Sequence, residues 1–160
     1  MASRDTTLQN PTYVLDKTIQ SIYKAPSEIG ETRHLDLYAC RVEAGFPSPA
    51  DDFLETSLDL NEHLVQHPSA TFFVRVNGDS MIGVGIHHND ILVVDKSLSP
   101  KHGSIVIAVL NGELTVKTLE YRNNDPFLVP ANPSYPITSI TSEMEFSIWG
   151  VVTSVIHQFK

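Results

Sequence analysis

Residues 104–119 read SIVIAVL-NG-ELTVKTL, two apolar runs that are separated by Asn111 and Gly112. Both runs are rich in β-branched residues, which favour strands. An Asn-Gly pair between two such runs predicts a two-residue hairpin, because both central residues of a type I′ turn need a positive φ. We therefore expect an antiparallel β-hairpin at this point of the chain.

The segments around the hairpin have the same character. Several short runs are rich in β-branched and aromatic residues and are bounded by turn residues, which predicts strands. These runs are Thr71–Val76, Ile91–Asp95, Ser104–Leu110, Glu113–Leu119, Phe127–Val129 and Phe146–Ile156. A chain of 160 residues is long enough for one sizeable core. The pattern predicts a mostly β fold with a small, strongly twisted, barrel-like domain.

The part of the chain before Thr71 is less regular. Leucines and a phenylalanine recur among acidic residues from Ala50 to Leu64, an amphipathic pattern that predicts one or two short helices. Upstream, Pro26 and Gly30 interrupt any long periodic pattern. Short elements are expected only at residues 12–15 and 19–23, so residues 1–44 are expected to form an extended N-terminal arm and residues 45–160 the β domain.

The charge distribution argues against direct DNA binding. Residues 1–44 hold five Lys/Arg and six Asp/Glu, a net charge of −1, and residues 45–160 hold six and thirteen, a net of −7. A protein that grips the phosphate backbone normally concentrates Lys and Arg on one face. We expect little direct DNA binding by this chain.

The composition of the sequence also indicates in which cellular compartment the protein is expected. The sequence has no apolar run of bilayer length and no signal-peptide pattern at its start. Its single cysteine, Cys40, excludes an internal disulfide framework. We expect a cytoplasmic protein without a membrane anchor.

The loop Asn77-Gly78-Asp79-Ser80-Met81 directly follows an apolar strand. A glycine before a serine lets the backbone turn sharply, which exposes the hydroxyl and leaves backbone N–H groups able to stabilise an oxyanion. Gly-x-Ser is nevertheless common, and on this motif alone an ordinary loop with capping side chains is favoured.

Lys117 lies in the middle of the second strand of the hairpin, between Val116 and Thr118. A lysine at such a position more often extends to solvent. If it is buried instead, desolvation lowers its pKa, and the neutral amine can accept a proton from a serine.

Five ordered blocks together resemble the LexA/UmuD group of self-cleaving serine peptidases. They are the loop segment 76–82, the turn and apolar strand at 85–95, the hairpin at 102–119, the stretch 128–137 with Leu128-Val129-Pro130-Ala131-Asn132-Pro133, and the terminal Trp149-Gly150-Val151-Val152. The resemblance extends from about Glu43 to Ile156. It implies the small twisted β domain of that family.

The resemblance also implies roles for individual residues. Ser80 corresponds to the nucleophile and Lys117 to the general base of a Ser/Lys dyad. The backbone N–H groups of Asp79 and Ser80 correspond to the oxyanion site. The family cuts its own chain at Cys-Gly or Ala-Gly, which here corresponds to Ala44–Gly45.

The short segment before the expected cut resembles the UmuD branch, since a LexA-type DNA-binding domain needs about sixty residues or more. UmuD-like proteins form homodimers, are stimulated to cleave by RecA filaments on single-stranded DNA, and then serve a UmuC-like polymerase in error-prone translesion synthesis. The resemblance implies these partners here. A non-cleaving interaction module and a LexA-like repressor remain alternatives.

We expect no metal and no cofactor. Seven histidines are scattered along the chain, and no Cys or carboxylate cluster has zinc-like spacing. The adjacent His87 and His88 would point to opposite faces of a strand.

Overall fold

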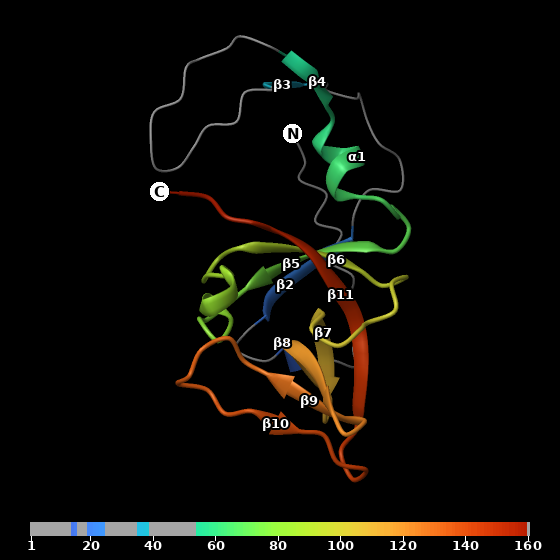
Figure 1. Cartoon of the computed structure of the whole chain (residues 1–160), viewed down its shortest axis with the longest axis vertical. Coiled ribbons are helices and arrows are strands. Elements are labelled where there is room, and N and C mark those ends of the chain that lie inside the picture. Colours follow the sequence, from blue (N-terminus) through green and yellow to red (C-terminus); the bar gives the residue numbers. More distant parts are fainter. Residues whose placement is uncertain (1–13, 16–18, 25–34, 39–53, 160) are drawn as a thin grey trace.

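The computed structural model describes residues 14–15, 19–24, 35–38 and 54–159. Most of them belong to one nine-stranded sheet with the order β10-β9-β8-β7-β11-β6-β5-β2, and β1 pairs with β8 outside this path (Figure 1). The strands of this sheet are β1 (Val14–Leu15), β2 (Ile19–Lys24), β5 (Thr71–Val76), β6 (Ile91–Asp95), β7 (Ile105–Leu110), β8 (Glu113–Arg122), β9 (Asp125–Val129), β10 (Thr138–Ser139) and β11 (Phe146–Ile156). The mostly β fold class is confirmed.

The hairpin predicted at residues 104–119 is β7–β8. Leu110 pairs with Glu113 across the turn. Asn111 and Gly112 have φ of 50° and 81°, as a type I′ turn needs. The three predicted strands Thr71–Val76, Ile91–Asp95 and Phe146–Ile156 have the predicted bounds.

The long strand β11 gives the sheet its bend. Its first half pairs with β7 and its second half with β6, and the pairing register shifts once in each half. Such irregularities bend a strand and increase its twist. Gly150 lies at this bend, where an added Cβ would come within 2.6 Å of Val94 Cγ1. The sequence therefore keeps a glycine where the two strands approach closely.

The two short strands β1 and β2 pair with different parts of the curved sheet. β1 runs parallel to β8, while β2 pairs antiparallel with β5. Because β7, β11 and β6 lie between β8 and β5, β1 and β2 pair with two strands that are distant in the strand order. The barrel-like shape that the sequence predicted is confirmed, and the expected arm contributes strands to it.

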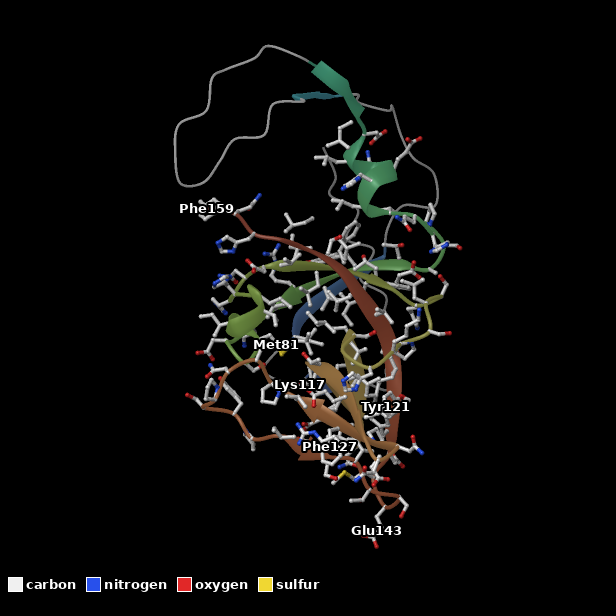
Figure 2. The ribbon with its side chains drawn as sticks, viewed as in Figure 1. Met81, Lys117, Tyr121, Phe127, Glu143 and Phe159 are labelled. Carbon is white, nitrogen blue, oxygen red and sulfur yellow. The ribbon has the colours of Figure 1, made fainter. Side chains whose placement is uncertain are left out.

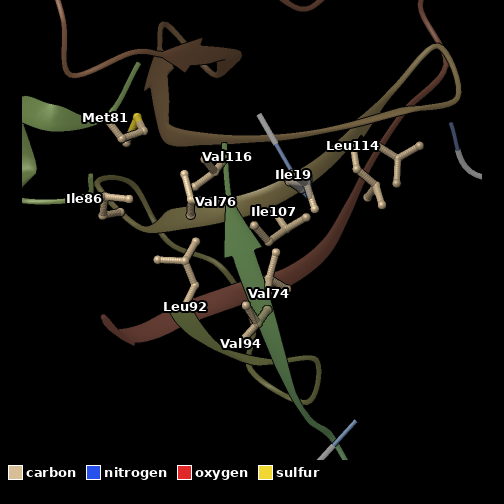
Figure 3. Close-up of a cluster of buried hydrophobic side chains, with 11 residues drawn as sticks. Ile19, Val74, Val76, Met81, Ile86, Leu92, Val94, Ile107, Leu114 and Val116 are labelled. Carbon is tan, nitrogen blue, oxygen red and sulfur yellow. The ribbon is translucent and has the colours of Figure 1, made fainter. Parts of the chain in front are cut away.

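The core fills the inside of the curved sheet (Figure 3). Its main cluster contains Ile19, Val74, Val76, Met81, Ile86, Leu92, Val94, Ile107, Val109, Leu114 and Val116. Ile19 comes from the arm and is only 2% exposed. Met81 follows directly after the candidate nucleophile and is 1% exposed, so its burial fixes the end of that loop.

The helical prediction for residues 50–64 is wrong in part. Helix α1 covers only Leu60–Leu64, with Asp59 as its N-cap, and a short 3₁₀ helix, η1, covers Ile82–Val84. Residues Leu54–Leu58 form β4, which pairs with β3 (Leu35–Tyr38) in a separate two-stranded sheet. Over five residues the LETSL pattern fits a strand as well as a helix, and the distant partner strand decides between them.

Candidate active site

The loop between β5 and η1 holds Ser80 inside the domain. Gly78 has a φ of +95°, the left-handed conformation that glycine adopts without strain, and it turns the chain after Val76. Ser80 is 3% exposed. The sharp turn that the sequence predicted at this glycine is present, but the predicted exposure of the serine side chain is wrong, because the loop packs Ser80 into the domain.

Lys117 approaches this loop from β8. Its Nζ lies 3.2 Å from Ser80 Oγ. The same Nζ donates to Thr115 Oγ1 at 3.0 Å and to the carbonyl oxygen of Val116 at 2.9 Å. Figure 2 shows the labelled Lys117 and Met81, the neighbour of Ser80, in the middle of the sheet domain. The structure thus brings together the serine and the lysine that the sequence singled out.

The backbone next to Ser80 has N–H groups that are available to donate hydrogen bonds to a negatively charged oxygen atom. Within the described part of the chain, the N–H groups of Asp79 and Ser80 have no hydrogen-bond acceptor. Unpaired N–H groups beside a hydroxyl are the arrangement that stabilises an oxyanion. The predicted cleavage residues Ala44 and Gly45, in contrast, lie outside the described residues.

A second segment clamps the serine loop, and sequence reasoning gave its residues no role. Ala131 donates from its N–H to the carbonyl oxygen of Ser80 at 2.9 Å, and its own carbonyl accepts from Gly83 N at 2.7 Å. A Cβ at Gly83 would lie 2.4 Å from that same carbonyl oxygen, so only glycine permits this approach. Residues 80 and 83 are therefore held against residue 131 on both sides of the turn.

Two side chains complete the clamp at Asp79. Asn132 Nδ2 donates to the Asp79 carbonyl at 3.1 Å, and the Tyr135 hydroxyl donates to Asp79 Oδ1 at 2.6 Å. The hydrogen bond to the Asp79 carboxylate raises the pKa of Tyr135 above its ordinary value of 10.0. The Tyr135 phenol therefore stays protonated, and keeps its donor, through moderately alkaline pH.

A groove of about 210 Å³ opens beside the lysine. It is lined by residues of β8, β9 and the segment around Tyr135, among them Thr115, Lys117, Leu128 and Pro136. Its walls combine apolar side chains with the amine, a surface that an extended peptide with small residues can contact. The groove can therefore receive a polypeptide segment next to Lys117.

Another cluster was missed by the sequence reasoning. His87, Asp90 and His157 bring three potential ligand atoms within 4.8 Å of one another. Asp90 and His157 are 67 positions apart, and no local spacing pattern connects them. The antiparallel pairing of β6 with the end of β11 is what brings them together.

Comparison of the sequence with known proteins points to the same class of protein, a peptidase. Residues 36–153 match the family model described as Peptidase S24-like. The chain is 48% identical over 120 residues to protein MucA of Salmonella typhimurium, covering 74% of this chain and 82% of MucA. It is 43% identical over 144 residues to protein ImpA of Salmonella typhimurium, covering 89% of this chain and 98% of ImpA.

A LexA repressor shares only part of its length with the chain. The LexA repressor of Syntrophotalea carbinolica is 46% identical over 89 residues, which cover 56% of this chain and 44% of the repressor. No helix among the described residues is long and apolar enough to cross a membrane. The family match spans most of the sequence, and the nearly full-length similarity to ImpA contrasts with the partial similarity to LexA. The chain therefore belongs to the S24-like peptidase family, as a UmuD-like member of its LexA/UmuD group.

Proposed function

We propose that this chain cleaves itself at Ala44–Gly45, with Ser80 as the nucleophile and Lys117 as the general base. The observation that carries the proposal is the 3.2 Å separation between Lys117 Nζ and Ser80 Oγ inside the domain. That distance is within hydrogen-bonding reach, which a general base needs in order to take the proton of the nucleophile. Membership of a peptidase family supports the same chemistry.

The contacts around the amine can hold an ammonium ion, with its three N–H donors, and also a neutral base. A neutral lysine has two N–H donors and one lone pair. The two N–H groups can remain on Thr115 Oγ1 and the Val116 carbonyl, both of which accept from Nζ. The lone pair is then directed to Ser80, whose hydroxyl donates to it. In this form the dyad is ready for proton transfer.

The reaction proceeds in two stages. Lys117 takes the Ser80 proton while Oγ attacks the carbonyl carbon of Ala44, and the N–H groups of Asp79 and Ser80 stabilise the oxyanion. The bond to Gly45 then breaks, Lys117 returns its proton to the new amine of Gly45, and residues 1–44 remain as an ester on Ser80. Water, deprotonated by Lys117, hydrolyses this ester and frees the serine.

A tethered substrate explains why a shallow site suffices. The segment around Ala44 is part of the same chain or is supplied by a partner copy, so its effective concentration is high. A small residue on each side of the scissile bond lets an extended segment enter the 210 Å³ groove without steric conflict. Cleavage thus cuts the covalent link between residues 1–44 and the processed domain, residues 45–160.

The UmuD-like membership supports a proposal for the biological setting. We propose a cytoplasmic homodimer whose cleavage is stimulated by RecA filaments on single-stranded DNA. The processed form then serves as an accessory subunit of a UmuC-like, error-prone translesion polymerase. The net charge of −8 supports protein partners rather than direct binding to DNA.

The decisive experiment follows the appearance of a new N-terminus. Purified protein is incubated with RecA, ATP and single-stranded DNA, and separately at alkaline pH without RecA, and the products are identified by mass spectrometry. A product that begins at Gly45, absent in Ser80→Ala and present in the exposed-serine control Ser142→Ala, supports self-cleavage. Chains that stay intact under both conditions would favour a non-cleaving interaction module.

A further inference from the structure

The cluster of His87, Asp90 and His157 lies outside the dyad and has no role in the proposed cleavage. His87 and Asp90 belong to the turn between η1 and β6, and His157 follows the end of β11. We propose that these three side chains form a binding site for one zinc ion.

Asp90 is the centre of the cluster. Its side chain is 3% exposed, and Oδ2 accepts a hydrogen bond from the backbone N–H of His87 at 2.7 Å. Oδ1 lies 2.5 Å from His157 Nδ1. A carboxylate that is held so firmly inside the domain presents its remaining lone pairs in a fixed direction.

His87 supplies the observation that points to a missing partner. Its Nδ1 atom is shielded from solvent and has no hydrogen-bond partner, although about half of the ring surface is exposed. Asp90 Oδ2 lies 3.6 Å away, within ion-pair range but beyond hydrogen-bonding distance. A buried polar atom without a partner is unfavourable, and coordination to a metal ion would satisfy it.

The spacing of the three atoms suits a small cation after a modest adjustment. Zinc binds imidazole nitrogen and carboxylate oxygen at about 2.0–2.2 Å, so tetrahedral ligands lie roughly 3.4 Å apart. The three ligand atoms are within 4.8 Å of one another, and both histidine side chains are partly exposed. Metal binding would replace the hydrogen bond between His157 and Asp90, and the proton on His157 Nδ1 would move to Nε2 of the same ring.

The donor set selects among metals. Two imidazoles and one carboxylate are typical of zinc, whereas magnesium and calcium prefer oxygen ligands alone. Asp90 and His157 line a groove of about 510 Å³, which lets the ion enter and lets a water molecule take the fourth position. The site is therefore a three-ligand zinc site that remains open to solvent.

Zinc at this position would stabilise the segment that leads into the serine loop. The backbone of Asp90 accepts from Val76 N, and Asn89 N donates to the Val76 carbonyl, both at 2.9 Å. His88 Nδ1 accepts from Gly78 N at 3.2 Å. An ion that joins this turn to the end of β11 would fix the point at which the chain enters residues 77–81.

The test uses the full chain without a histidine tag and with Ser80→Ala, so that cleavage does not interfere. Isothermal titration with ZnCl₂ is expected to give one ion per chain, and zinc is expected to raise the thermal unfolding midpoint. His87→Gln and His157→Asn should each weaken zinc binding at least tenfold. The exposed histidine His63, changed to Ala, is the matched control and should leave binding unaltered.

Cobalt(II) provides a readout that is independent of stability. It should give the intense visible absorption of a four-coordinate ion, lost in His87→Gln even if His157→Asn fails to fold. Magnesium should have no effect at the same concentration. Zinc binding that persists unchanged in both histidine variants, or no stoichiometric binding at all, would overturn the proposal without affecting the Ser80–Lys117 dyad.

Discussion

Lys117 Nζ lies 3.2 Å from Ser80 Oγ, although 37 positions separate the two residues and three strands lie between β8 and β5 in the sheet. The curvature of the sheet is what brings them together. A flat sheet with the same strand order would hold these strands at least four inter-strand spacings apart, roughly 19 Å. The contact between Ser80 and Lys117 therefore depends on the barrel-like closure of the sheet as well as on the two side chains.

Replacing the lysine tests the role of its amine. Lys117→Met keeps much of the side-chain volume but cannot accept a proton, so we expect the cleavage rate to fall by roughly 10²–10⁴-fold. In the wild type without RecA, cleavage should accelerate from pH 7 to pH 10, because only the deprotonated amine is a base. Gel densitometry of initial rates measures both effects.

The control for this prediction is Lys101→Met, which removes an exposed lysine outside the site and should cleave at the wild-type rate. A pH profile that is flat from 7 to 10 would argue against a lysine base.

Much of this site could be predicted from the sequence because its signals are local. Gly78 before Ser80 marks the turn, and the Asn111-Gly112 hairpin sets Lys117 in its strand. The contact between the two side chains is not local, and it was inferred from family resemblance.

Other features could not be predicted because they depend on distant segments. Ala131, Asn132 and Tyr135 reach the serine loop across about 50 positions, through backbone groups and polar side chains that have no periodic signature. The same holds for β4, whose partner strand β3 decides its conformation. The sequence indicates the elements well, but their long-range pairings only poorly.

Tyr135 is expected to act as a positioning residue. Tyr135→Phe removes the 2.6 Å hydrogen bond to Asp79 and loosens the loop that holds Ser80, so we expect cleavage to slow several-fold. Because the pKa of Tyr135 is raised, the bond persists in the wild type under alkaline assay conditions. The rate deficit should therefore be present at both pH 8 and pH 10.

The matched control is Tyr121→Phe, since Tyr121 is similarly exposed but its hydroxyl has no hydrogen-bond partner among the described residues. Equal rates for both variants would show that the Tyr135–Asp79 bond does not position the nucleophile loop. The unfolding midpoint of Tyr135→Phe should change little, which separates positioning from loss of fold.

Asp95 should govern part of the acid stability. Burial of its carboxyl opposes ionisation, but hydrogen bonds from Ser97 and the pairing with His67 together outweigh it, so its pKa lies below the ordinary 3.8. Between the two pKa values, the unfolded chain binds more protons than the folded chain. The stabilisation from Asp95 is therefore present above about pH 4, and it is lost as the pH falls through the lower pKa of the folded state.

Asp95→Asn removes this charge. We expect it to lower the free energy of unfolding at pH 7 by about 1–3 kcal/mol, the typical contribution of hydrogen bonds to a charged group. It should also flatten the decline in stability below pH 4, measured by urea unfolding. The exposed Asp125→Asn should change neither, and an acid limb as steep in Asp95→Asn as in the wild type would contradict the assignment.

The strand β2 predicts what happens to the arm after cleavage. β2 lies on the N-terminal side of Ala44–Gly45, yet it pairs with β5, and Ile19 is 2% exposed in the core. Hydrolysis breaks one peptide bond but none of these contacts. We therefore expect residues 1–44 to stay bound to residues 45–160 after cleavage and to co-elute with them in size-exclusion chromatography under native conditions.

Ile19 provides the variant that separates the two pieces. Ile19→Ala should lower the free energy of unfolding of the intact chain by about 2–4 kcal/mol, the usual loss for a buried isoleucine. After cleavage it should release the arm from the domain. Tyr23→Ala, on the same strand but 42% exposed, should retain it. If the wild-type arm leaves at once and the domain keeps its unfolding midpoint, the domain does not need β2 for its stability. If the arm stays bound at first and dissociates later, its dissociation would expose the edge of β5. A partner strand could then pair with that edge.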